Sequence, residues 1–307
     1  MKKTLLVGNF GAGNIGDEAI LLGFLDRFPG NDYIIISAHP NQTKKNYKTP
    51  SIHPIPCGPR SFFRSFFSGN LSKTIKEFRE SKKVIFPGGG LFCDPSKAIF
   101  IWFIHLSLAL ILKKEVYFYG QSFIPISNKV WRKILGKALR NKRIKKIEVR
   151  DPLSKDFLEK KLKLKEIKLG KDSATYLKNI PLKPKSINKN KKVVVSLREG
   201  STTKKEIIKL AEELEKKYTQ IIFLEMQRAN KDEKGDKIEH QKIAKYISNK
   251  SIYKFHTPKD PHDAMKVIFE CDLVIASRLH AIVLAHVLGK RFRALTKSDK
   301  IRGFLKV

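Results

Sequence analysis

Residues Thr4–Glu18 read TLLVGNFGAGNIGDE, and this stretch decides the fold class. Its opening apolar run is typical of a buried strand, and the glycines that follow mark a tight turn. The two acids at its end suit the first turn of a helix, where the positive end of the helix dipole favours negative charge. A strand, a glycine-rich turn and a helix in this order predict the start of a parallel α/β unit.

The same alternation continues along the chain in two blocks. The first block adds predicted strands at Tyr33–Ser37, Lys83–Phe86, Glu115–Tyr119 and Lys146–Val149. The second block has predicted strands at Val193–Leu197, Gln220–Leu224, Ser251–Phe255, Leu273–Ala276 and Phe292–Leu295. Its predicted helices lie near 203–217, 236–248, 261–270 and 279–288. Repeated strand–helix pairs of this kind predict doubly wound sheets.

A polar stretch, Leu177–Lys192, separates the two blocks. It holds two prolines and shows no apolar period, so we expect a linker there. The predicted organisation is an N-terminal Rossmann-like domain over 1–178 and a C-terminal Rossmann-like domain over 190–307, facing each other across a cleft. Ligands of such sheets bind beyond the carboxyl ends of the strands, so the residues that follow each strand are the candidates for chemistry.

Composition narrows the class of protein. The 307 residues are 41% apolar and 30% charged, which predicts a globular chain and excludes disordered and fibrous folds. Lys and Arg number 63 against 29 acids, a net charge of +34, so the protein either meets an anionic partner or tolerates strong self-repulsion. The densest basic stretch, Trp131–Arg150, has nine basic residues and one acid in a helical pattern. Three readings stay open for it: a solvated helix face, an anionic membrane surface, or nucleic acid, which lacks a supporting motif and is not expected as a partner.

The sequence predicts no disulfide, metal site, signal peptide or membrane span. Three widely spaced cysteines give neither a disulfide framework nor a zinc site, and no metal is predicted. The N-terminus does not read as a signal peptide, and the apolar run Ala98–Leu112 is short for a membrane span and predicts a buried helix. We therefore expect a cytoplasmic protein, with peripheral association at the inner face of the membrane as a further expectation.

Two glycine motifs follow the first and third predicted strands. Gly11–Gly16 matches G-x-G-x-x-G, but Ala38 and His39 stand where a ribose-binding acid would follow the second strand, so a nicotinamide cofactor is not favoured. The motif is either a tight turn before a capped helix or a turn that brings backbone amides and an acid to a sugar. Gly88–Gly90 likewise either touches a ligand or forms a tight turn against a neighbouring loop.

Two arginines and a histidine end the strands of the second block. Arg278 and His280 follow Leu273–Ala276, and Arg198 ends the strand that starts at Val193. Guanidinium groups grip carboxylates and phosphates, so this pair suits a small dianion. The alternative is an arginine in a salt bridge and a histidine satisfied in the core. For Arg150–Asp151, which precedes Pro152, a structural role at a helix start is favoured.

Six motifs follow one another along the chain: Gly11–Ala19 (GAGNIGDEA), Pro87–Gly90 (PGGG), Val149–Asp151 (VRD) with Ser154, Ser196–Arg198 (SLR), Met226–Gln227 and Ser277–Ala281 (SRLHA). Taken in this order, they resemble the polysaccharide pyruvyl transferase family. The resemblance implies a glycosyltransferase-B-like (GT-B-like) fold, phosphoenolpyruvate as donor and no further cofactor, and a cell-envelope or exopolysaccharide sugar, free or lipid-linked, as acceptor. The first domain would hold the acceptor and the second the donor.

The resemblance also implies roles for residues. Arg198 and Arg278 would bind donor phosphate and carboxylate, and His280 would act as general acid. An imidazole suits protonation of the donor's enol carbon, and Asp17 or Glu18 is a candidate base for closing the cyclic ketal. Candidate acceptor or backbone contacts are Asn14, Glu18, Gly88, Gly89 and Gly90. Two other functions stay open: a glycosyltransferase that uses a nucleotide sugar, and a catalytically silent glycan- or polyanion-binding protein.

Overall fold

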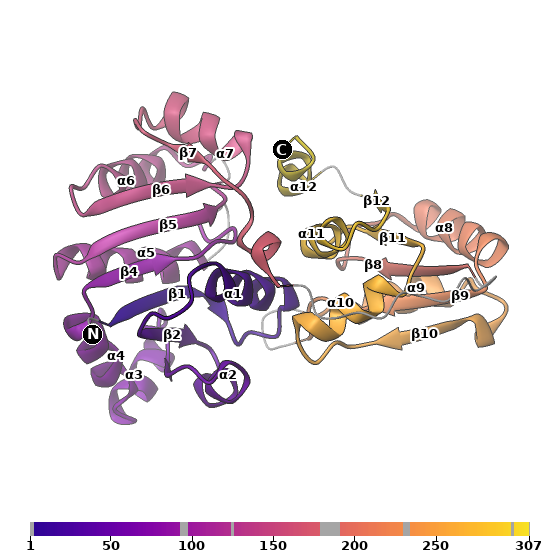
Figure 1. Cartoon of the computed structure of the whole chain (residues 1–307), viewed down its shortest axis with the longest axis horizontal. Helices are drawn as coiled ribbons and strands as arrows, with labels where there is room; N and C mark the ends of the chain where they lie inside the picture. Colours follow the sequence, from indigo (N-terminus) through magenta and orange to yellow (C-terminus); the bar gives the residue numbers. More distant parts are fainter. Residues whose placement is uncertain are drawn as a thin grey trace. The chain divides into compact units, whose positions relative to one another are not determined.

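The computed structural model describes residues 3–92, 98–123, 126–178, 191–229, 234–295 and 298–306. Contacts divide the chain into two compact units, each of which is described by itself (Figure 1). Unit 1 comprises Met1–Ala12, Ile20–Tyr176 and Arg302–Val307, and unit 2 comprises Gly13–Ala19 and Leu177–Ile301. The predicted ranges of 1–178 and 190–307 differ from these units in three short segments, 13–19, 177–178 and 302–307. The predicted linker lies mostly outside the described residues.

Unit 1 is built on a seven-stranded parallel sheet with strand order β3-β2-β1-β4-β5-β6-β7. The strand β1 pairs with β2 on one side and β4 on the other, so the winding direction reverses between β1 and β4. This reversal is the switch point of a doubly wound sheet. The strands are β1 (Thr4–Phe10), β2 (Tyr33–Ser37), β3 (Ser51–Ile52), β4 (Lys83–Phe86), β5 (Glu115–Gln121), β6 (Ile144–Val149) and β7 (Lys168–Leu169).

Helices cover both faces of this sheet because its strands are apolar on both faces. Leu5, Val84 and Phe86 face a large cluster that includes side chains of α4, α5 and α6, whereas Leu6 and Ile35 face α1. The helices described here are α1 (Ile15–Arg27), α2 (Pro40–Tyr47), α3 (Pro59–Phe67), α4 (Asn70–Glu80), α5 (Ala98–Ile111), α6 (Lys129–Leu139) and α7 (Pro152–Asp156), then the π-helical turn η1 (Phe157–Lys161) and the 3-10 turn η2 (Ser173–Tyr176).

Two predictions for unit 1 need correction. The basic stretch Trp131–Arg150 is not one helix: α6 ends at Leu139 and β6 begins at Ile144. Ile147 and Val149 are buried where β6 pairs with β5, and this burial overrides the helical charge pattern. The helix α5 forms as predicted, but only one of its faces is buried, and Phe100 is exposed. Within the described residues, none of the helices is long and apolar enough to cross a membrane.

Unit 2 is a five-stranded parallel sheet in the order β10-β9-β8-β11-β12. Its winding direction reverses between β8 and β11, and valines of β8 lie in its core. The predicted strands and helices of this block are confirmed to within a few residues at each end, except that the predicted helix 236–248 ends earlier, at Ala244, as the bounds show. The elements are β8 (Lys192–Ser196), α8 (Lys204–Lys217), β9 (Gln220–Leu224), α9 (Lys237–Ala244), η3 (Lys250–Ile252), β10 (Tyr253–His256), α10 (Pro261–Phe269), β11 (Leu273–Ala276), α11 (Leu279–Val287) and β12 (Phe292–Ala294). The helix α12 (Asp299–Phe304) follows and has residues in both units; neither η3 nor α12 is predicted from the sequence.

Candidate functional site

The candidate site of unit 2 lies at the carboxyl ends of β8 and β11. These strands are hydrogen-bonded neighbours, with Ser196 opposite Ala276. Arg198 follows β8 and Arg278 follows β11, so the two arginines sit on adjacent strand ends at the switch point of the sheet. Ligands of doubly wound sheets bind at this position. The strand order therefore places Arg198 and Arg278 at the same edge of the sheet, after neighbouring strands.

Ser277 connects the loops that follow β8 and β11 through hydrogen bonds. Its Oγ accepts a hydrogen bond of 2.8 Å from the backbone N–H of Arg198 and lies 2.8 Å from the Oγ of Ser201. Its own N–H donates to the carbonyl of Ser196 at 3.0 Å. The side chain of Arg198 is exposed. The backbone of this arginine is thus fixed while its guanidinium group reaches solvent.

A buried carboxylate orients the second arginine. The Nε of Arg278 donates to both carboxylate oxygens of Asp236, at 2.8 and 3.1 Å, and its Nη2 donates to Oδ1. Asp236 is fully buried, and its Oδ2 also accepts from the N–H groups of Met226 and Gln227 at 3.1 and 3.0 Å. Burial raises the pKa of this carboxyl, and the charge of Arg278 and the backbone donors oppose that rise. Three of the five guanidinium N–H groups remain outside this pair.

Sequence reasoning missed Asp236. It stands at the start of a predicted helix, where an acid usually caps the helix with its side chain. In the structure it occupies the N-cap of α9, but its carboxylate makes no cap hydrogen bond and turns to Arg278 instead. The preceding Gly235 has a φ of +76°, a value that favours glycine. The Gly-Asp pair at the start of α9 was the available signal.

The first turn of α1 belongs to the same cluster. Asn14 forms an antiparallel bridge with Gln227, in which the N–H of Ile15 donates to Met226 at 2.8 Å and that of Arg228 donates to Gly13 at 3.0 Å. The loop that holds Asp236 therefore also holds the glycine motif. The predicted motif and the predicted Arg-Leu-His element meet within unit 2.

Asn14 and Gly16 have local tasks in this turn. The Oδ1 of Asn14 accepts from the N–H groups of Gly16 and Asp17, at 2.9 and 3.4 Å, and so caps α1. A Cβ on Gly16 would lie 2.1 Å from the Nδ1 of His280, so the glycine allows the helix turn to pack on the imidazole. Asp17 and Glu18 are half-buried in this first turn, where they complement the helix dipole as expected.

Glu239 and His240 of α9 hold the loop that follows β8. Glu239 is buried and accepts from the N–H of Gly200 at 3.2 Å, from the hydroxyl of Thr202 and from Lys242 at 2.8 Å. Burial works to raise its pKa, but these partners together lower it. The Nε2 of buried His240 accepts from the N–H of Leu197 at 3.0 Å, and burial lowers the pKa of this imidazole to about 3. Both groups fix the backbone on either side of Arg198.

The triple glycine of unit 1 packs against a neighbouring loop. The carbonyl of Gly89 accepts from the N–H of Ser122 at 2.8 Å and from the side chain of Gln121 at 2.6 Å. A Cβ on Gly88, whose φ is +139°, would lie 3.1 Å from Ile20. The turn follows β4 at the switch point of the first sheet. The contact roles of Gly88, Gly89 and Gly90 toward an acceptor stay predictions.

The structural role of Arg150–Asp151 is confirmed. Arg150 is buried, donates from Nε to the Oγ of Ser122 at 2.7 Å and forms an ion pair with Asp172. Asp151 caps α7 by accepting from the N–H of Ser154 at 2.7 Å, with Pro152 at the first helical position. These side chains join the loops after β5, β6 and β7.

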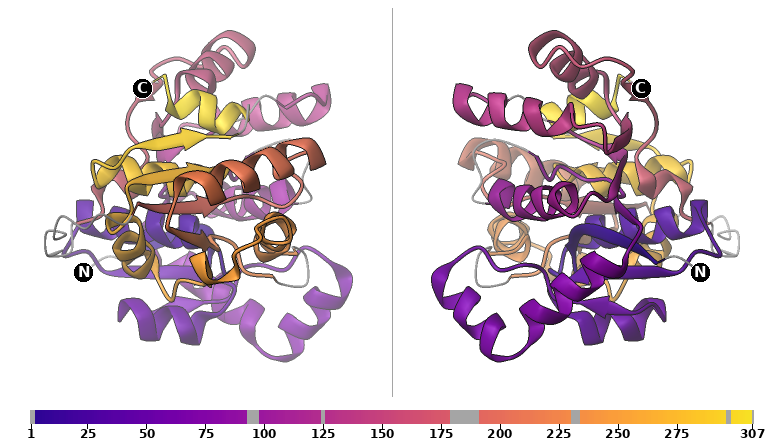
Figure 2. Two further views of the ribbon diagram at one scale, coloured as in Figure 1. Left: turned by 90° about the vertical axis from the view of Figure 1, so that its right-hand side faces the viewer. Right: turned by 90° about the vertical axis from the view of Figure 1, so that its left-hand side faces the viewer.

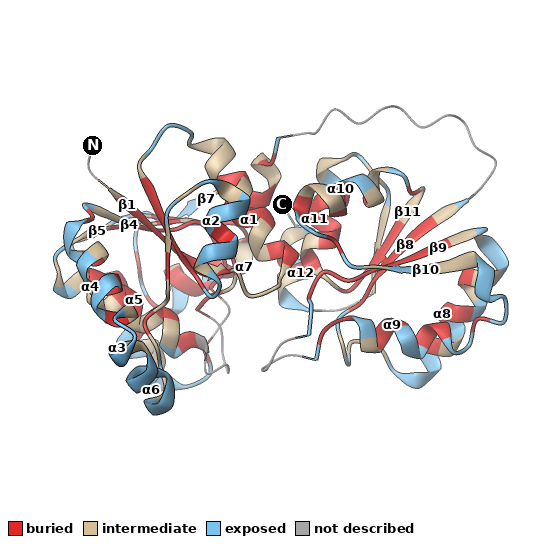
Figure 3. Ribbon diagram, turned by 90° about the horizontal axis from the view of Figure 1, so that it is seen from below, coloured by how far each residue is buried: buried red, intermediate tan, exposed pale blue. Residues whose placement is uncertain are grey.

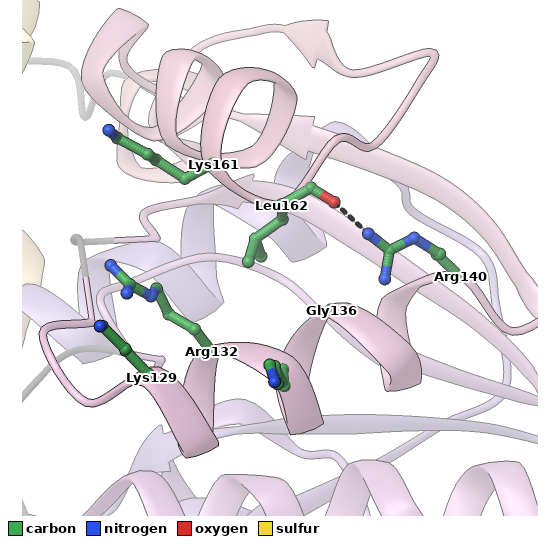
Figure 4. Close-up of a pocket in the computed structure, with 7 residues that line it drawn as sticks. Lys129, Arg132, Gly136, Arg140, Lys161 and Leu162 are labelled. Atoms are coloured by element: carbon green, nitrogen blue, oxygen red, sulfur yellow. Dashed lines mark hydrogen bonds between the residues drawn. The ribbon is translucent and has the colours of Figure 1, made fainter.

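A basic hollow of about 440 Å³ lies in unit 1 between α6 and η1 (Figure 4). The guanidinium group of Arg140 donates to the carbonyl of Leu162 at its rim. None of the predicted donor-binding or catalytic residues lines it, so we do not place the reaction there. Its lining residues are Lys129, Arg132, Lys133, Gly136, Arg140, Lys161 and Leu162.

Two Rossmann-like sheets with charged residues at a switch point define the chain as a two-domain α/β protein of the GT-B type, as predicted. Residues 14–299 match the polysaccharide pyruvyl transferase family, and the chain belongs to it. Membership of this family indicates that the chain is a transferase of polysaccharide biosynthesis.

Other proteins are similar to the chain in sequence or in fold. The amylovoran biosynthesis protein AmsJ of Erwinia amylovora is 22% identical, over 99% of this chain and 85% of that protein. The UDP-GlcNAc 2-epimerase of Neisseria meningitidis, bound to UDP-GlcNAc, has a TM-score of 0.60 at 14% identity, over 98% of this chain and 85% of that one. Anabaena Alr3699/HepE, in complex with UDP-glucose, has a TM-score of 0.58 at 14% identity, over 96% and 80%. At these identities the solved structures show the fold alone.

Proposed function

We propose that this protein transfers the pyruvyl group of phosphoenolpyruvate to a sugar of a cell-envelope or exopolysaccharide glycan and forms a cyclic ketal. The observation that carries the proposal is the pair of strand-end arginines at the switch point, one of them oriented by the buried carboxylate of Asp236. Family membership gives the class of reaction, and phosphoenolpyruvate is the small polyanion that this pair suits.

The donor is bound by two cations with different tasks. Arg278 is held by Asp236 and keeps three N–H groups for a carboxylate or phosphate. Arg198 is exposed on a fixed backbone and closes on the second anionic group. The amides at the N-terminus of α11, which begins directly after Arg278, add affinity for an anion.

His280 supplies the proton that starts the reaction. It is the second residue of α11, next to the arginine that binds the donor. Transfer of its proton to the CH₂ carbon of the enol gives a methyl group and an oxocarbenium-like carbon, which one sugar hydroxyl attacks as the proton of that hydroxyl passes to the now neutral imidazole. A second hydroxyl then attacks the same carbon and phosphate leaves, so that two C–O bonds form and one breaks. The developing charge is stabilised by the two arginines.

Asp17 is the proposed base that accepts a hydroxyl proton as the ring closes. It lies in the first turn of α1, directly after Gly16, whose backbone packs on the imidazole of His280. Its neighbour Glu18 shares this turn and contacts the acceptor together with Asn14. The acceptor is a free or lipid-linked glycan, and the site of action is the cytoplasmic side of the membrane.

Calorimetric titration of phosphoenolpyruvate tests the donor site. Substitution Arg198→Gln removes an exposed cation without leaving a buried carboxylate unpaired, and Arg60→Gln on α3 is a control with the same change in charge. At about 0.15 M salt we expect saturable binding by the wild type, a loss of about tenfold or more in affinity for Arg198→Gln, and no change for Arg60→Gln.

Two outcomes would contradict the donor assignment. Equal losses for both variants would mean that the net charge alone attracts the anion. Tight binding of UDP-glucose in place of phosphoenolpyruvate would favour a glycosyltransferase. Release of inorganic phosphate on addition of an acceptor glycan separates an enzyme from a silent binding protein, because only turnover frees phosphate.

A further inference from the structure

The helix α3 carries four phenylalanines that its own unit does not cover. It reads PRSFFRSFF, and none of its residues is buried. Phe62, Phe63, Phe66 and Phe67 are 45%, 60%, 61% and 80% exposed. A surface helix of a globular domain normally turns its apolar side chains to the core. Four exposed phenylalanines on one short helix therefore point to a partner outside unit 1.

The sequence around these rings is basic, and the acids of the neighbouring helix α4, Glu77 and Glu80, both pair with Lys3, at 3.1 and 2.8 Å. Arg60 and Arg64 are exposed on the same helix. The sequence from Tyr33 to Lys76 contains seven basic residues and no Asp or Glu. A helix with phenylalanines on one part of its surface and arginines on the other has the composition of interfacial helices, which lie in the headgroup region of a bilayer.

Neighbouring helices extend this surface. Figures 2 (right) and 3 show α3, α4, α5 and α6 along one side of the sheet of unit 1. The segment Val116–Ile147, which includes α6, contains nine basic residues and no acid. Exposed apolar side chains also lie on this side, among the exposed cations of α6. They are Phe100 of α5 and Val130 and Ile134 of α6, beside Lys129, Lys133 and Lys137.

We propose that α3, with the basic surface of α6, docks unit 1 on an anionic lipid bilayer. Phenylalanine rings enter the boundary between headgroups and acyl chains, and the arginines and lysines bind lipid phosphates. A second copy of this chain is a poorer occupant, because two proteins of charge +34 repel each other. The proposal does not depend on the pyruvyl transfer, since the docking surface shares no residue with the strand-end site.

Flotation with vesicles of phosphatidylglycerol and phosphatidylcholine tests the docking surface. The variant Phe66→Ser/Phe67→Ser removes the two most exposed rings, and Tyr246→Ser removes an exposed ring of unit 2 as a control. We expect the double variant to bind about tenfold or more weakly than the wild type and the control to bind normally. The difference persists at about 1 M salt, because salt screens the charges and leaves apolar contacts in place.

The arginines are tested in the same assay. We expect Arg60→Gln/Arg64→Gln to weaken binding at low salt, and Lys204→Gln/Lys205→Gln, with the same change in charge on unit 2, to bind like the wild type. Equal losses for the two variants would overturn a defined docking surface. Wild-type binding by the phenylalanine variant would do the same, as would binding to neutral vesicles of phosphatidylcholine at equal strength.

Tryptophan fluorescence tests whether α3 itself enters the bilayer. In Phe67→Trp an added indole reports its surroundings, and the wild type gives the background of its two tryptophans. Vesicles with brominated phosphatidylglycerol quench the added emission if the ring enters the bilayer. Unquenched emission from bound protein would overturn the proposal. A different result would also overturn it: sedimentation in which the wild type is a dimer and the α3 variants are monomers, while the variants still bind vesicles like the wild type.

Discussion

Asp236 connects three parts of unit 2 through one carboxylate. It accepts hydrogen bonds from Arg278 and from the N–H groups of Met226 and Gln227. The same loop bridges to Asn14 at the start of α1. A buried carboxylate with this many donors is costly to alter, because any donor that it releases stays buried without a partner.

Substitution Asp236→Asn tests this positioning role. The amide has one acceptor oxygen, so at least one of the donors loses its partner, and we expect the free energy of unfolding to fall by about 1–3 kcal/mol. The guanidinium group loses its counter-charge and its fixed direction, so kcat for ketal formation falls more than KM for phosphoenolpyruvate rises. Steady-state kinetics and urea unfolding measure the two effects.

A matched control is Glu225→Gln, a buried acid of the preceding loop that accepts from Thr257 at 2.7 Å. We expect this variant to keep its kcat. A proportional rise in KM with unchanged kcat in Asp236→Asn would show that Asp236 contributes to binding alone and does not orient the reacting groups.

Gly16 gives a second prediction. A methyl group there would overlap the imidazole of His280, so Gly16→Ala displaces the proposed acid. We expect turnover to fall by about tenfold or more and stability to fall by about 1–3 kcal/mol. Gly30→Ala is the control, because a Cβ there meets nothing within 4 Å although its φ is +78°. Equal activity in the two variants would show that His280 takes no part in the reaction.

Sequence reasoning found the arginines but not their partner. Arg198 and Arg278 end apolar runs, and a local pattern of this kind is visible in one dimension. The hydrogen bond between Asp236 and Arg278 joins residues 42 positions apart, one at the start of α9 and one after β11. The glycine before Asp236 marks an unusual turn, but it does not name the distant partner, so Asp236 looked like an ordinary helix cap.

At the scale of elements, strand order was the part that the sequence left open. Apolar runs located β2, β4, β9 and β11 to the residue, because fully buried parallel strands are continuously apolar. Their order places the loops after β1 and β4, and those after β8 and β11, at the two switch points. The short edge strands β3 and β7 were not predicted, since two residues carry no period.

The helix α8 begins with a capping box, a few residues after Arg198. The side chain of Thr203 accepts from the N–H of Glu206 at 3.3 Å, and Glu206 accepts from the N–H of Thr203 at 2.7 Å, which forms a capping box. We expect Thr203→Ala to lower the free energy of unfolding by about 1 kcal/mol in urea titrations. Thr219→Ala, at another exposed threonine of unit 2, should cost about 0.5 kcal/mol or less. Equal costs would mean that the box adds nothing.

At the scale of the whole molecule, the described part of each unit contains one buried histidine, and both of these histidines lower the stability of the protein in acid. The Nε2 of His105 accepts from the N–H of Ile55 at 3.0 Å in unit 1, and that of His240 accepts from Leu197 in unit 2. A protonated imidazole could not accept these bonds. Burial accordingly lowers the pKa of His105 to about 4 and that of His240 to about 3, from an ordinary value of 6.5.

The sign of the pH dependence follows from these values. Below pH 6.5 the unfolded chain binds a proton at each histidine that the folded chain does not, so acid favours unfolding until the folded pKa is reached. At about pH 5 each histidine lowers the free energy of unfolding by about 2 kcal/mol relative to neutral pH. Carboxylates with lowered pKa values, such as Glu239, lose their contribution only below about 4.5, so they stay ionised between pH 5 and 7.

Urea unfolding at pH 5 and pH 7 measures this loss. His105→Gln and His240→Gln keep an acceptor but cannot titrate, so each should flatten the pH dependence by about 2 kcal/mol, the first in the transition of unit 1 and the second in that of unit 2. His286→Gln, at an exposed histidine of α11, is the control and should leave the slope unchanged. If the His105 and His240 variants keep the slope of the wild type, protons bind elsewhere, and the folded state does not require these two imidazoles to be neutral.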